Sequence, residues 1–272
     1  MNLKNKTIAF IGAGNMGEAL IRGLQAAGTM KPEQIIITDV REDRLEILSK
    51  AFGVRTLADN AAAVSAANIV LLAVKPQHMT KVLAGFRDAV TGDKLLISIA
   101  AGIPTTKIEG VLGGAPHVVR VMPNTPALVG AGATALCKGR HATDDDLETA
   151  EAILGAVGTT ARTEEQYMDA VTALSGSGPA YIFLVAEAMT KAGIEVGLSE
   201  HVSRTLTQQT ILGAARLMVE SGELPAELRR RVTSPGGTTE AAIKVMNSHK
   251  LTEIFIEAIK AAADRGRELS GS

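Results

Sequence analysis

The first half of the chain alternates short apolar runs with longer stretches in which apolar residues recur at helical spacing. The apolar runs predict strands over 7–11, 34–38, 68–74, 94–99, 117–121, 133–136 and 159–162. Amphipathic stretches such as 18–27 and 44–51 lie between them. Alternation at this spacing is typical of βαβ units and a mostly parallel sheet. The run Ile35, Ile36 and Ile37 indicates a strand covered by helices on both faces.

The second half has only the helical period after the acidic turn at 163–165. Five helices are expected there, and residues with known start and stop preferences mark their ends. The first is expected to run from Pro179 to Gly193 and the second from Ser199 to Gly222. The third is expected to start at Pro225, the fourth to be capped by Thr238 or Thr239, and the last to span 251–269. We therefore expect an α/β Rossmann-type domain, doubly wound and mostly parallel, over residues 1–163, and an all-α domain over 164–272.

Two segments of the helical half, 181–186 and 211–219, are apolar on nearly every face. A helix that is apolar all round is normally buried. A domain of about 100 residues has little interior for two such helices. We therefore expect a second copy of the chain to cover them in an interlocked, obligate homodimer.

Composition excludes several other functions. The chain has 272 residues, a formal net charge of −1, 3% aromatic residues and no Trp, so it lacks the basic field and the stacking platforms of nucleic-acid-binding proteins. Cys137 is the only cysteine, which excludes an internal disulfide and a Cys-based zinc site, and we expect no metal. No apolar run is long enough to span a bilayer and no secretory signal is apparent, so we expect a cytoplasmic protein without membrane contact.

A glycine-rich turn follows the first predicted strand. Its residues are Gly12, Ala13, Gly14, Asn15, Met16 and Gly17. In a dinucleotide-binding turn the first glycine allows the tight turn, the second lets the pyrophosphate approach the backbone, and the third lets the helix pack on the strand. The strand before and the helix after the motif favour this interpretation over a tight turn without a ligand.

The end of the second strand bears on the choice of nucleotide. Asp39 stands where an acid accepts the hydroxyls of an adenosine ribose, which favours NAD. Arg41 and Arg44 follow, and an arginine there can hold a 2′-phosphate, which favours NADP. The residues leave both cofactors open, NADPH first and NADH as the alternative. If neither residue contacts a nucleotide, Asp39 is an ordinary turn residue and Arg41 is a solvent-exposed charge.

Other strand ends add small residues to the same edge of the sheet. The segment Ala73, Val74, Lys75 and Pro76 ends one strand, and the small residues Ala100 and Ala101 follow the next. A stiff loop, 121–126, ends another, in which Asn124 is either a ligand contact or the start of an Asx turn.

A second glycine-rich turn lies between two predicted helices, at 233–239. It offers hydroxyls, unencumbered backbone N–H groups and the start of a helix, which together suit a small carboxylate. A rigid loop between helices is the equally simple alternative.

The motifs at 12–17, 73–76, 121–126, 174–181 and 234–239 occur in this order, with this spacing, in Δ1-pyrroline-5-carboxylate reductases, which the whole chain resembles. The block 228–243 resembles the signature of that family. The resemblance implies reduction of the C=N bond of 1-pyrroline-5-carboxylate to L-proline by NADPH or NADH, the last step of proline synthesis. It also implies a dimer, which often assembles further into rings.

The resemblance also implies site residues. Cofactor contacts are expected at 12–17, at Asn60, at 73–76 and at Ala100 and Ala101. Positions near the substrate are Glu165, Ser234, Gly237, Thr238 and Thr239. Of these, Thr239 is expected to hydrogen-bond the ring nitrogen and Glu165 to balance the iminium charge, so both are candidate catalytic residues. Family members often carry a small polar residue where this chain has Asp39.

Hydride transfer to a protonated imine needs no nucleophile and no metal, which agrees with the absence of such motifs from the sequence. A β-hydroxyacid dehydrogenase is the nearest rival, but no lysine lies one turn into the helix after Gly178. A reductase of another cyclic imine and a non-catalytic NADP(H)-binding paralogue are the remaining alternatives.

Overall fold

The computed structural model describes residues 3–270 and divides into two compact units. Unit 1 comprises Met1–Ser177 together with Ala262–Ser272, and unit 2 comprises Gly178–Ala261. The last helix, α12 (Leu251–Ser270), has residues in both units. The division of the chain at 163/164 stays a prediction about domains.

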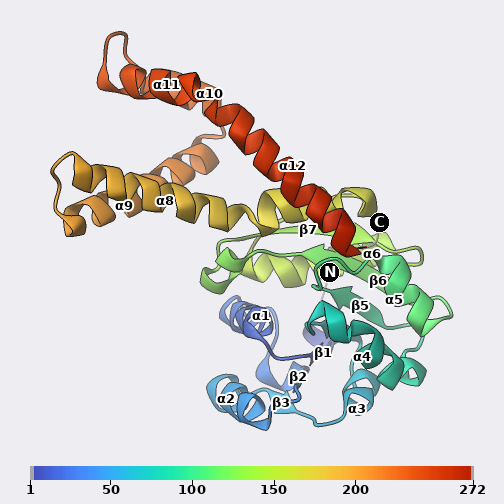
Figure 1. Ribbon diagram of the computed structural model, residues 1–272. Coiled ribbons are helices and arrows are strands. Elements are labelled where there is room, and N and C mark those ends of the chain that lie inside the picture. Colours follow the sequence, from blue (N-terminus) through green and yellow to red (C-terminus); the bar gives the residue numbers. More distant parts are fainter. Residues whose placement is uncertain (1–2, 271–272) are drawn as a thin grey trace. The chain divides into compact units, whose positions relative to one another are not determined.

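Unit 1 is built on one eight-stranded sheet in the order β3-β2-β1-β4-β5-β6-β7-β8 (Figure 1). The strands are β1 (Ile8–Ile11), β2 (Ile35–Thr38), β3 (Arg55–Thr56), β4 (Ile69–Leu72), β5 (Leu95–Ser98), β6 (His117–Met122), β7 (Gly132–Lys138) and β8 (Gly158–Arg162). All neighbours pair in parallel except β6 and β7. The predicted doubly wound, mostly parallel sheet is confirmed.

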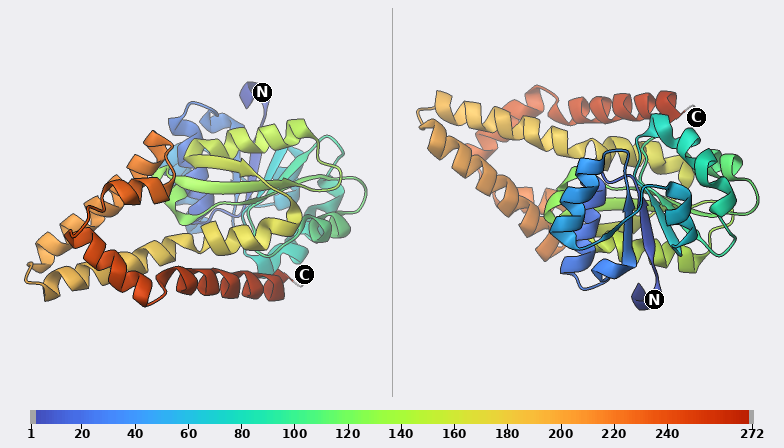
Figure 2. Two further views of the ribbon diagram at one scale, coloured as in Figure 1. Left: turned by 90° about the horizontal axis from the view of Figure 1, so that it is seen from above. Right: turned by 90° about the horizontal axis from the view of Figure 1, so that it is seen from below.

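Helices cover both faces of this sheet, and each face has its own apolar core (Figures 1 and 2). Residues of α1 (Asn15–Ala26), α2 (Glu42–Phe52) and α6 (Asp144–Leu154) form one core with alternate strand residues. Residues of α3 (Asn60–Ser65), α4 (Met79–Phe86) and α5 (Thr105–Leu112) form the other. Ile35, Ile36 and Ile37 are fully buried, as the run of three predicted.

The chain leaves the sheet through a short irregular helix rather than a regular one. A 3₁₀ turn (Glu165–Tyr167) leads into α7 (Met168–Val171) and then into a π-helical segment, Thr172–Gly176. Single π turns inside helices are frequent at functional sites.

Unit 2 contains helices and the loops that join them, and no strand among its described residues. It contains α8 (Gly178–Glu195), α9 (Glu200–Ser221), α10 (Pro225–Arg231), α11 (Thr238–Ser248) and the first part of α12. Ser199 caps α9 by accepting the Val202 N–H, and Gly222 ends it in the left-handed conformation (φ 65°). These two signals and the start at Pro225 were predicted and are confirmed.

Helices α8 and α9 form a hairpin, with the two helices side by side (Figure 2). Gly193 was predicted to stop α8, and that prediction is wrong because the helix continues to Glu195. The glycine instead allows a close approach of the helices, since a Cβ there would stand 2.1 Å from the Ser203 hydroxyl. That hydroxyl donates a 2.7 Å hydrogen bond to the Thr190 carbonyl.

The two apolar helices, which we expected a second copy of the chain to cover, are exposed in the single chain. Phe183 and Leu184 on α8 are 61% and 65% exposed, and Leu217 and Val219 on α9 are exposed as well. Exposed apolar side chains of this density mark an interaction surface. Among the described residues, no helix is long and apolar enough to cross a membrane.

Candidate functional site

The glycine turn after β1 has a separate requirement at each of its three glycines. Gly12 has φ 95°, and a Cβ there would stand 2.9 Å from the Ala73 carbonyl oxygen. Nothing lies within 4 Å of a Cβ added to Gly14. At Gly17 a Cβ would contact the Gly12 carbonyl oxygen at 3.4 Å, so the glycine lets α1 pack on the turn. These are the three properties that the sequence motif predicts.

Gly14 is the N-cap of α1, and no side chain caps this helix. Its first N–H groups are therefore open to an anion, and the open space above Gly14 lets that anion approach the backbone. The residues present fit the pyrophosphate of a dinucleotide.

This turn lies at the point where the strand order reverses. The chain runs outward from β1 to β2 and β3, and then returns to place β4 on the other side of β1. In open α/β sheets ligands bind at such a switch point, outside the carboxyl ends of the strands. The segment Ala73–Pro76 follows β4 at this edge, with Lys75 exposed. Ala100 and Ala101 follow β5 at the same edge, the first buried and the second exposed.

Asn60 lies farther along, in the connection from β3 to β4. It is the first residue of α3, whose cap is the carboxylate of Asp59, and it is half-buried.

Asp39 is held against the glycine turn. Its Oδ2 accepts the Ala13 N–H at 2.9 Å, and its Oδ1 accepts both the backbone N–H and the Nε of Arg41, at 3.0 and 3.2 Å. Burial alone would raise the pKa of Asp39, but these hydrogen bonds outweigh it and hold the pKa below its usual value. The carboxylate therefore fixes the conformation of the turn.

Of the two arginines near Asp39, only Arg41 is free to turn toward a ligand. Arg41 is half-exposed and pairs with Asp39 alone. Arg44 is largely buried, and its Nε donates to the Ala13 carbonyl at 2.8 Å while its Nη2 pairs with Glu18 at 2.6 Å. The hydrogen bond from Arg44 is the main reason that the pKa of Glu18 is lowered. The geometry thus favours a structural role for Arg44 over the predicted contact with a phosphate.

Asn124, which follows β6, does not form the Asx turn that the sequence left open. Its Oδ1 accepts the Ala133 N–H at 2.9 Å, and its Nδ2 donates to the Ser175 carbonyl at 3.2 Å. The side chain thus joins β7 to the π-helical segment.

Glu165 lies in a polar cluster inside unit 1. Its Oε1 pairs with Nη1 of Arg120, a side chain of β6 that is only 3% exposed. Its Oε2 accepts the Thr105 hydroxyl at 2.8 Å and the Thr105 N–H at 3.2 Å. With both oxygens occupied and the charge balanced by Arg120, the geometry favours a structural role for Glu165 over the predicted one beside the substrate.

Two further groups complete this cluster. Asp169 Oδ1 lies 4.0 Å from Arg120 Nη2, which is buried and has no hydrogen-bond partner among the described residues. Cys137 is buried beside Glu165, and burial, reinforced by the Glu165 charge, raises the pKa of its thiol to about 12. The thiol is therefore neutral and inert at physiological pH.

Sequence reasoning missed Arg120. It lies in the predicted strand 117–121, and the one available signal was a lone arginine inside an otherwise mostly apolar run. Such a charge requires a buried partner.

The second glycine turn, at 233–239, opens a helix of unit 2. Gly236 adopts φ 72°, and Gly237 is the N-cap of α11, so the predicted cap at Thr238 or Thr239 is wrong. No side chain caps α11. Ser234 packs against Gly237, where a Cβ would stand 2.5 Å from its hydroxyl oxygen. The Thr239 hydroxyl has no hydrogen-bond partner among the described residues. These groups remain open to a ligand.

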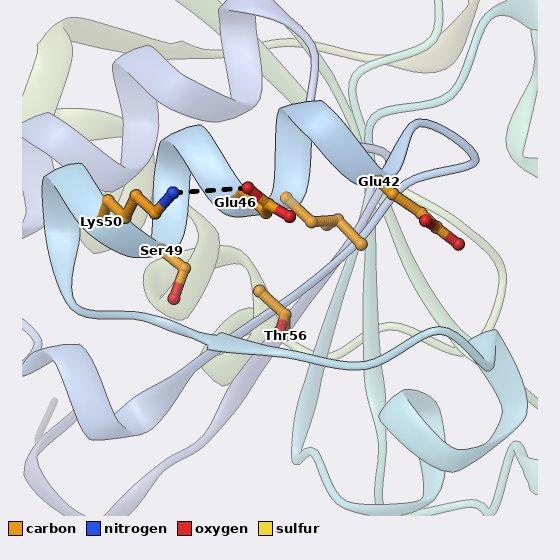
Figure 3. Close-up of a pocket in the computed structure, with 6 residues that line it drawn as sticks. Glu42, Glu46, Ser49, Lys50 and Thr56 are labelled. Atoms are coloured by element: carbon orange, nitrogen blue, oxygen red, sulfur yellow. Dashed lines mark hydrogen bonds and ion pairs between the residues drawn. The ribbon is translucent and has the colours of Figure 1, made fainter.

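Two hollows open on the surface of unit 1. One of about 290 Å³ is lined by α2 and β3 and contains the Lys50–Glu46 ion pair (Figure 3). None of the predicted site residues lines it. A second, of about 550 Å³, is bordered by Glu165, Thr105 and Lys138. Within the described part of the chain no group of His, Cys, Asp or Glu side chains is arranged to hold a metal ion.

A doubly wound sheet with an open glycine turn at its switch point, joined in one chain to a helical unit, defines a dinucleotide-dependent oxidoreductase. Family models refine this class. Residues 7–102 match the family "NADP oxidoreductase coenzyme F420-dependent", and residues 165–269 match "Pyrroline-5-carboxylate reductase dimerisation". The chain belongs to the pyrroline-5-carboxylate reductase family, whose members are oxidoreductases that act on a C=N bond.

Relatives of known name agree over the full length. The pyrroline-5-carboxylate reductase of Methanosarcina acetivorans is 44% identical, with 98% of this chain and 99% of the relative covered. That of Pseudomonas aeruginosa is 46% identical, with coverage of 97% and 96%. A solved structure of the reductase from Coxiella burnetii superimposes with a TM-score of 0.94 at 43% identity, covering 98% and 99% of the two chains. The Plasmodium falciparum reductase, solved with NADP bound, gives 0.86 at 30% identity, covering 98% and 99%.

Proposed function

We propose that this chain reduces the C=N bond of 1-pyrroline-5-carboxylate to L-proline with NADPH. The observation that carries the proposal is a pair of helix N-termini, each opened by a glycine turn and left without a side-chain cap. One is α1, behind Gly14, and the other is α11, behind Gly237. Other helices, such as α2, α5 and α10, also lack a side-chain cap, but their N-caps are Arg41, Pro104 and Leu224 rather than glycine. Two uncapped termini fit two anions, the pyrophosphate of a dinucleotide and the carboxylate of a small substrate.

In unit 1, the first turn of α1 would hold the pyrophosphate and Gly12–Gly17 would surround it. Asp39 and Arg41 would face the adenosine ribose, and 73–76 with Ala100 and Ala101 would border the nicotinamide. When bound, the dinucleotide supplies a hydride. Arg41 can exchange its carboxylate partner for a 2′-phosphate because nothing but Asp39 holds it among the described contacts. This supports NADPH, with NADH as the alternative.

In unit 2, the N–H groups at the start of α11 would bind the substrate carboxylate, helped by Ser234, Gly237 and Thr238. The hydroxyl of Thr239 would then hydrogen-bond the ring nitrogen and hold the iminium in orientation. A protonated imine is already electrophilic, so what the chain provides is alignment of the imine carbon with the hydride donor. No group of the chain has to form a covalent bond to the substrate.

The family's dimerisation model covers 165–269, and the apolar faces of α8 and α9 are exposed in the single chain. We propose that two chains cover these faces in an interlocked homodimer. A ring of dimers would be a further level of the same assembly.

The test is the loss of absorbance of the reduced dinucleotide on addition of 1-pyrroline-5-carboxylate, beside the six-membered cyclic imine as control. Selective turnover of the five-membered ring supports the proposal, and the ratio of NADPH to NADH rates fixes the cofactor. Dinucleotide binding without turnover of either imine would instead favour a non-catalytic paralogue.

The variant Thr239→Ala tests the substrate contact. Loss of one hydrogen bond to the reacting ring is expected to lower kcat/KM by about 10- to 100-fold. Thr252→Ala, at a hydroxyl on another helix of the unit, is the matched control. Unchanged kinetics for Thr239→Ala would remove this hydroxyl from the mechanism.

A further inference from the structure

One acidic side chain reaches into the second glycine turn from within α11. Glu240, the third residue of that helix, turns back so that its Oε2 accepts the Gly236 N–H at 2.8 Å. Gly236 is held in the left-handed conformation, which directs its N–H toward the start of the helix. One of the N–H groups on which a carboxylate would depend is therefore already bound to a carboxylate of the chain itself.

The charge of Glu240 is not balanced by a neighbouring cation. Within the described residues Glu240 forms no ion pair, although Lys244 stands one helical turn away. Of the three arginines of α10, Arg230 pairs with Glu227 and Arg231 pairs with Glu223, and Arg229 forms no ion pair with Glu240 among the described residues. In this respect Glu240 differs from Glu165, whose charge Arg120 neutralises.

We propose that Glu240 sets the affinity of the substrate site, as an internal anion that opposes the carboxylate of substrate and product. This inference rests on the proposed function, because it takes the start of α11 as the carboxylate cradle. Without substrate, the Glu240 carboxylate satisfies the Gly236 N–H and stabilises the start of the helix. With substrate bound, two negative charges share one helix terminus. Their repulsion weakens binding of 1-pyrroline-5-carboxylate and speeds release of L-proline.

The test compares the wild-type enzyme with Glu240→Gln. Glutamine keeps an oxygen that can accept the Gly236 N–H but removes the charge. We expect KM for 1-pyrroline-5-carboxylate and the inhibition constant of L-proline to fall together, each by about three- to tenfold, with kcat within about twofold. The difference from wild type should shrink as salt is raised, because salt screens repulsion between exposed charges. A purely structural role for Glu240 would not produce this salt dependence.

Two controls complete the design. Glu257→Gln makes the same change of charge on α12 and should leave both constants unchanged. Glu240→Asp keeps the charge and should keep the wild-type salt dependence. Equal constants for Glu240→Gln and wild type at every salt concentration would overturn the inference, and so would a rise in KM, which would make Glu240 a binding group. If the wild-type enzyme neither reduces 1-pyrroline-5-carboxylate nor binds L-proline, the proposed function itself has failed.

Discussion

The two units of this chain differ in how well each buries its apolar side chains within a single chain. Unit 1 buries its apolar residues in two cores, one on each face of the sheet, and balances its buried charges internally. In unit 2 large apolar side chains of α8 and α9 are exposed, and the only buried residues of these two helices are the polar Ser203 and Thr207. Burial of apolar area is the main driving force of folding, so unit 2 lacks in the single chain what unit 1 already has. The difference teaches that the fold of unit 2 is completed by assembly.

The largest effect is expected from a charge placed on the exposed apolar face of unit 2. Leu184→Glu puts a carboxylate into the proposed interface twice per dimer, and a buried unpaired charge costs several kcal/mol. We expect light scattering to show loss of the dimer and activity to fall by more than about 100-fold. The matched control is Ile47→Glu on α2, where a similarly exposed apolar residue of unit 1 is changed. A dimer that survives Leu184→Glu would place the interface elsewhere.

A glycine inside unit 2 sharpens the comparison by testing the close contact between α8 and α9. In Gly193→Ala the new methyl group would stand 2.1 Å from the Ser203 hydroxyl, so α8 and α9 must move apart. We expect the free energy of unfolding to fall by about 1–3 kcal/mol, measured by denaturant titration. Gly85→Ala in α4 of unit 1, where nothing lies within 4 Å of the added Cβ, should be neutral or stabilising. Equal effects at both sites would mean that the hairpin contact is loose.

The polar cluster of unit 1 offers a further test, in which a substitution should lower stability without changing catalysis. Glu165→Gln removes the charge that pairs with buried Arg120 and is expected to lower the free energy of unfolding by about 1–3 kcal/mol. The steady-state constants of the variant that remains folded should match those of the wild type. A large loss of kcat at unchanged stability would restore Glu165 to the substrate site.

The smallest effect is expected at Asp39 and depends on pH. Its pKa is held below the ordinary value of 3.8, so its stabilising contribution is complete above about pH 4. That contribution is lost as the pH falls through the lowered pKa. At neutral pH the free energy of unfolding of the wild type, measured by thermal denaturation, should therefore exceed that of Asp39→Asn by up to about 1 kcal/mol. This difference should disappear in acid. A gap that is independent of pH would show that the charge of Asp39 is not involved.

Much of unit 1 could be predicted from the sequence because its signals are local. The run Ile35–Ile37 predicts a buried strand, and the glycines of the first turn predict a tight turn. Each prediction depends only on residues that are neighbours in the sequence. The strand β3 was missed because it has only two residues, Arg55 and Thr56, both polar and exposed.

The parts that were missed depend on contacts distant in sequence. Arg44 contacts Ala13 and Glu18, and Glu165 pairs with Arg120, because the sheet topology brings these residues together. No local sequence pattern predicts that topology. Gly193 has the residue type of a helix stop, but its place is decided by Ser203 on the next helix. The start of α11 was misplaced because threonine is a good cap, whereas here Gly237 takes that position and leaves the threonine hydroxyls open.

The most direct test of this account is to measure NADPH binding and imine reduction on the same monomeric sample of Leu184→Glu. If unit 1 is complete in one chain and unit 2 is not, the variant should bind NADPH with a Kd close to that of the wild type while turnover of 1-pyrroline-5-carboxylate is lost. A monomer that turns over substrate at the wild-type rate, or one that no longer binds NADPH, would contradict the account.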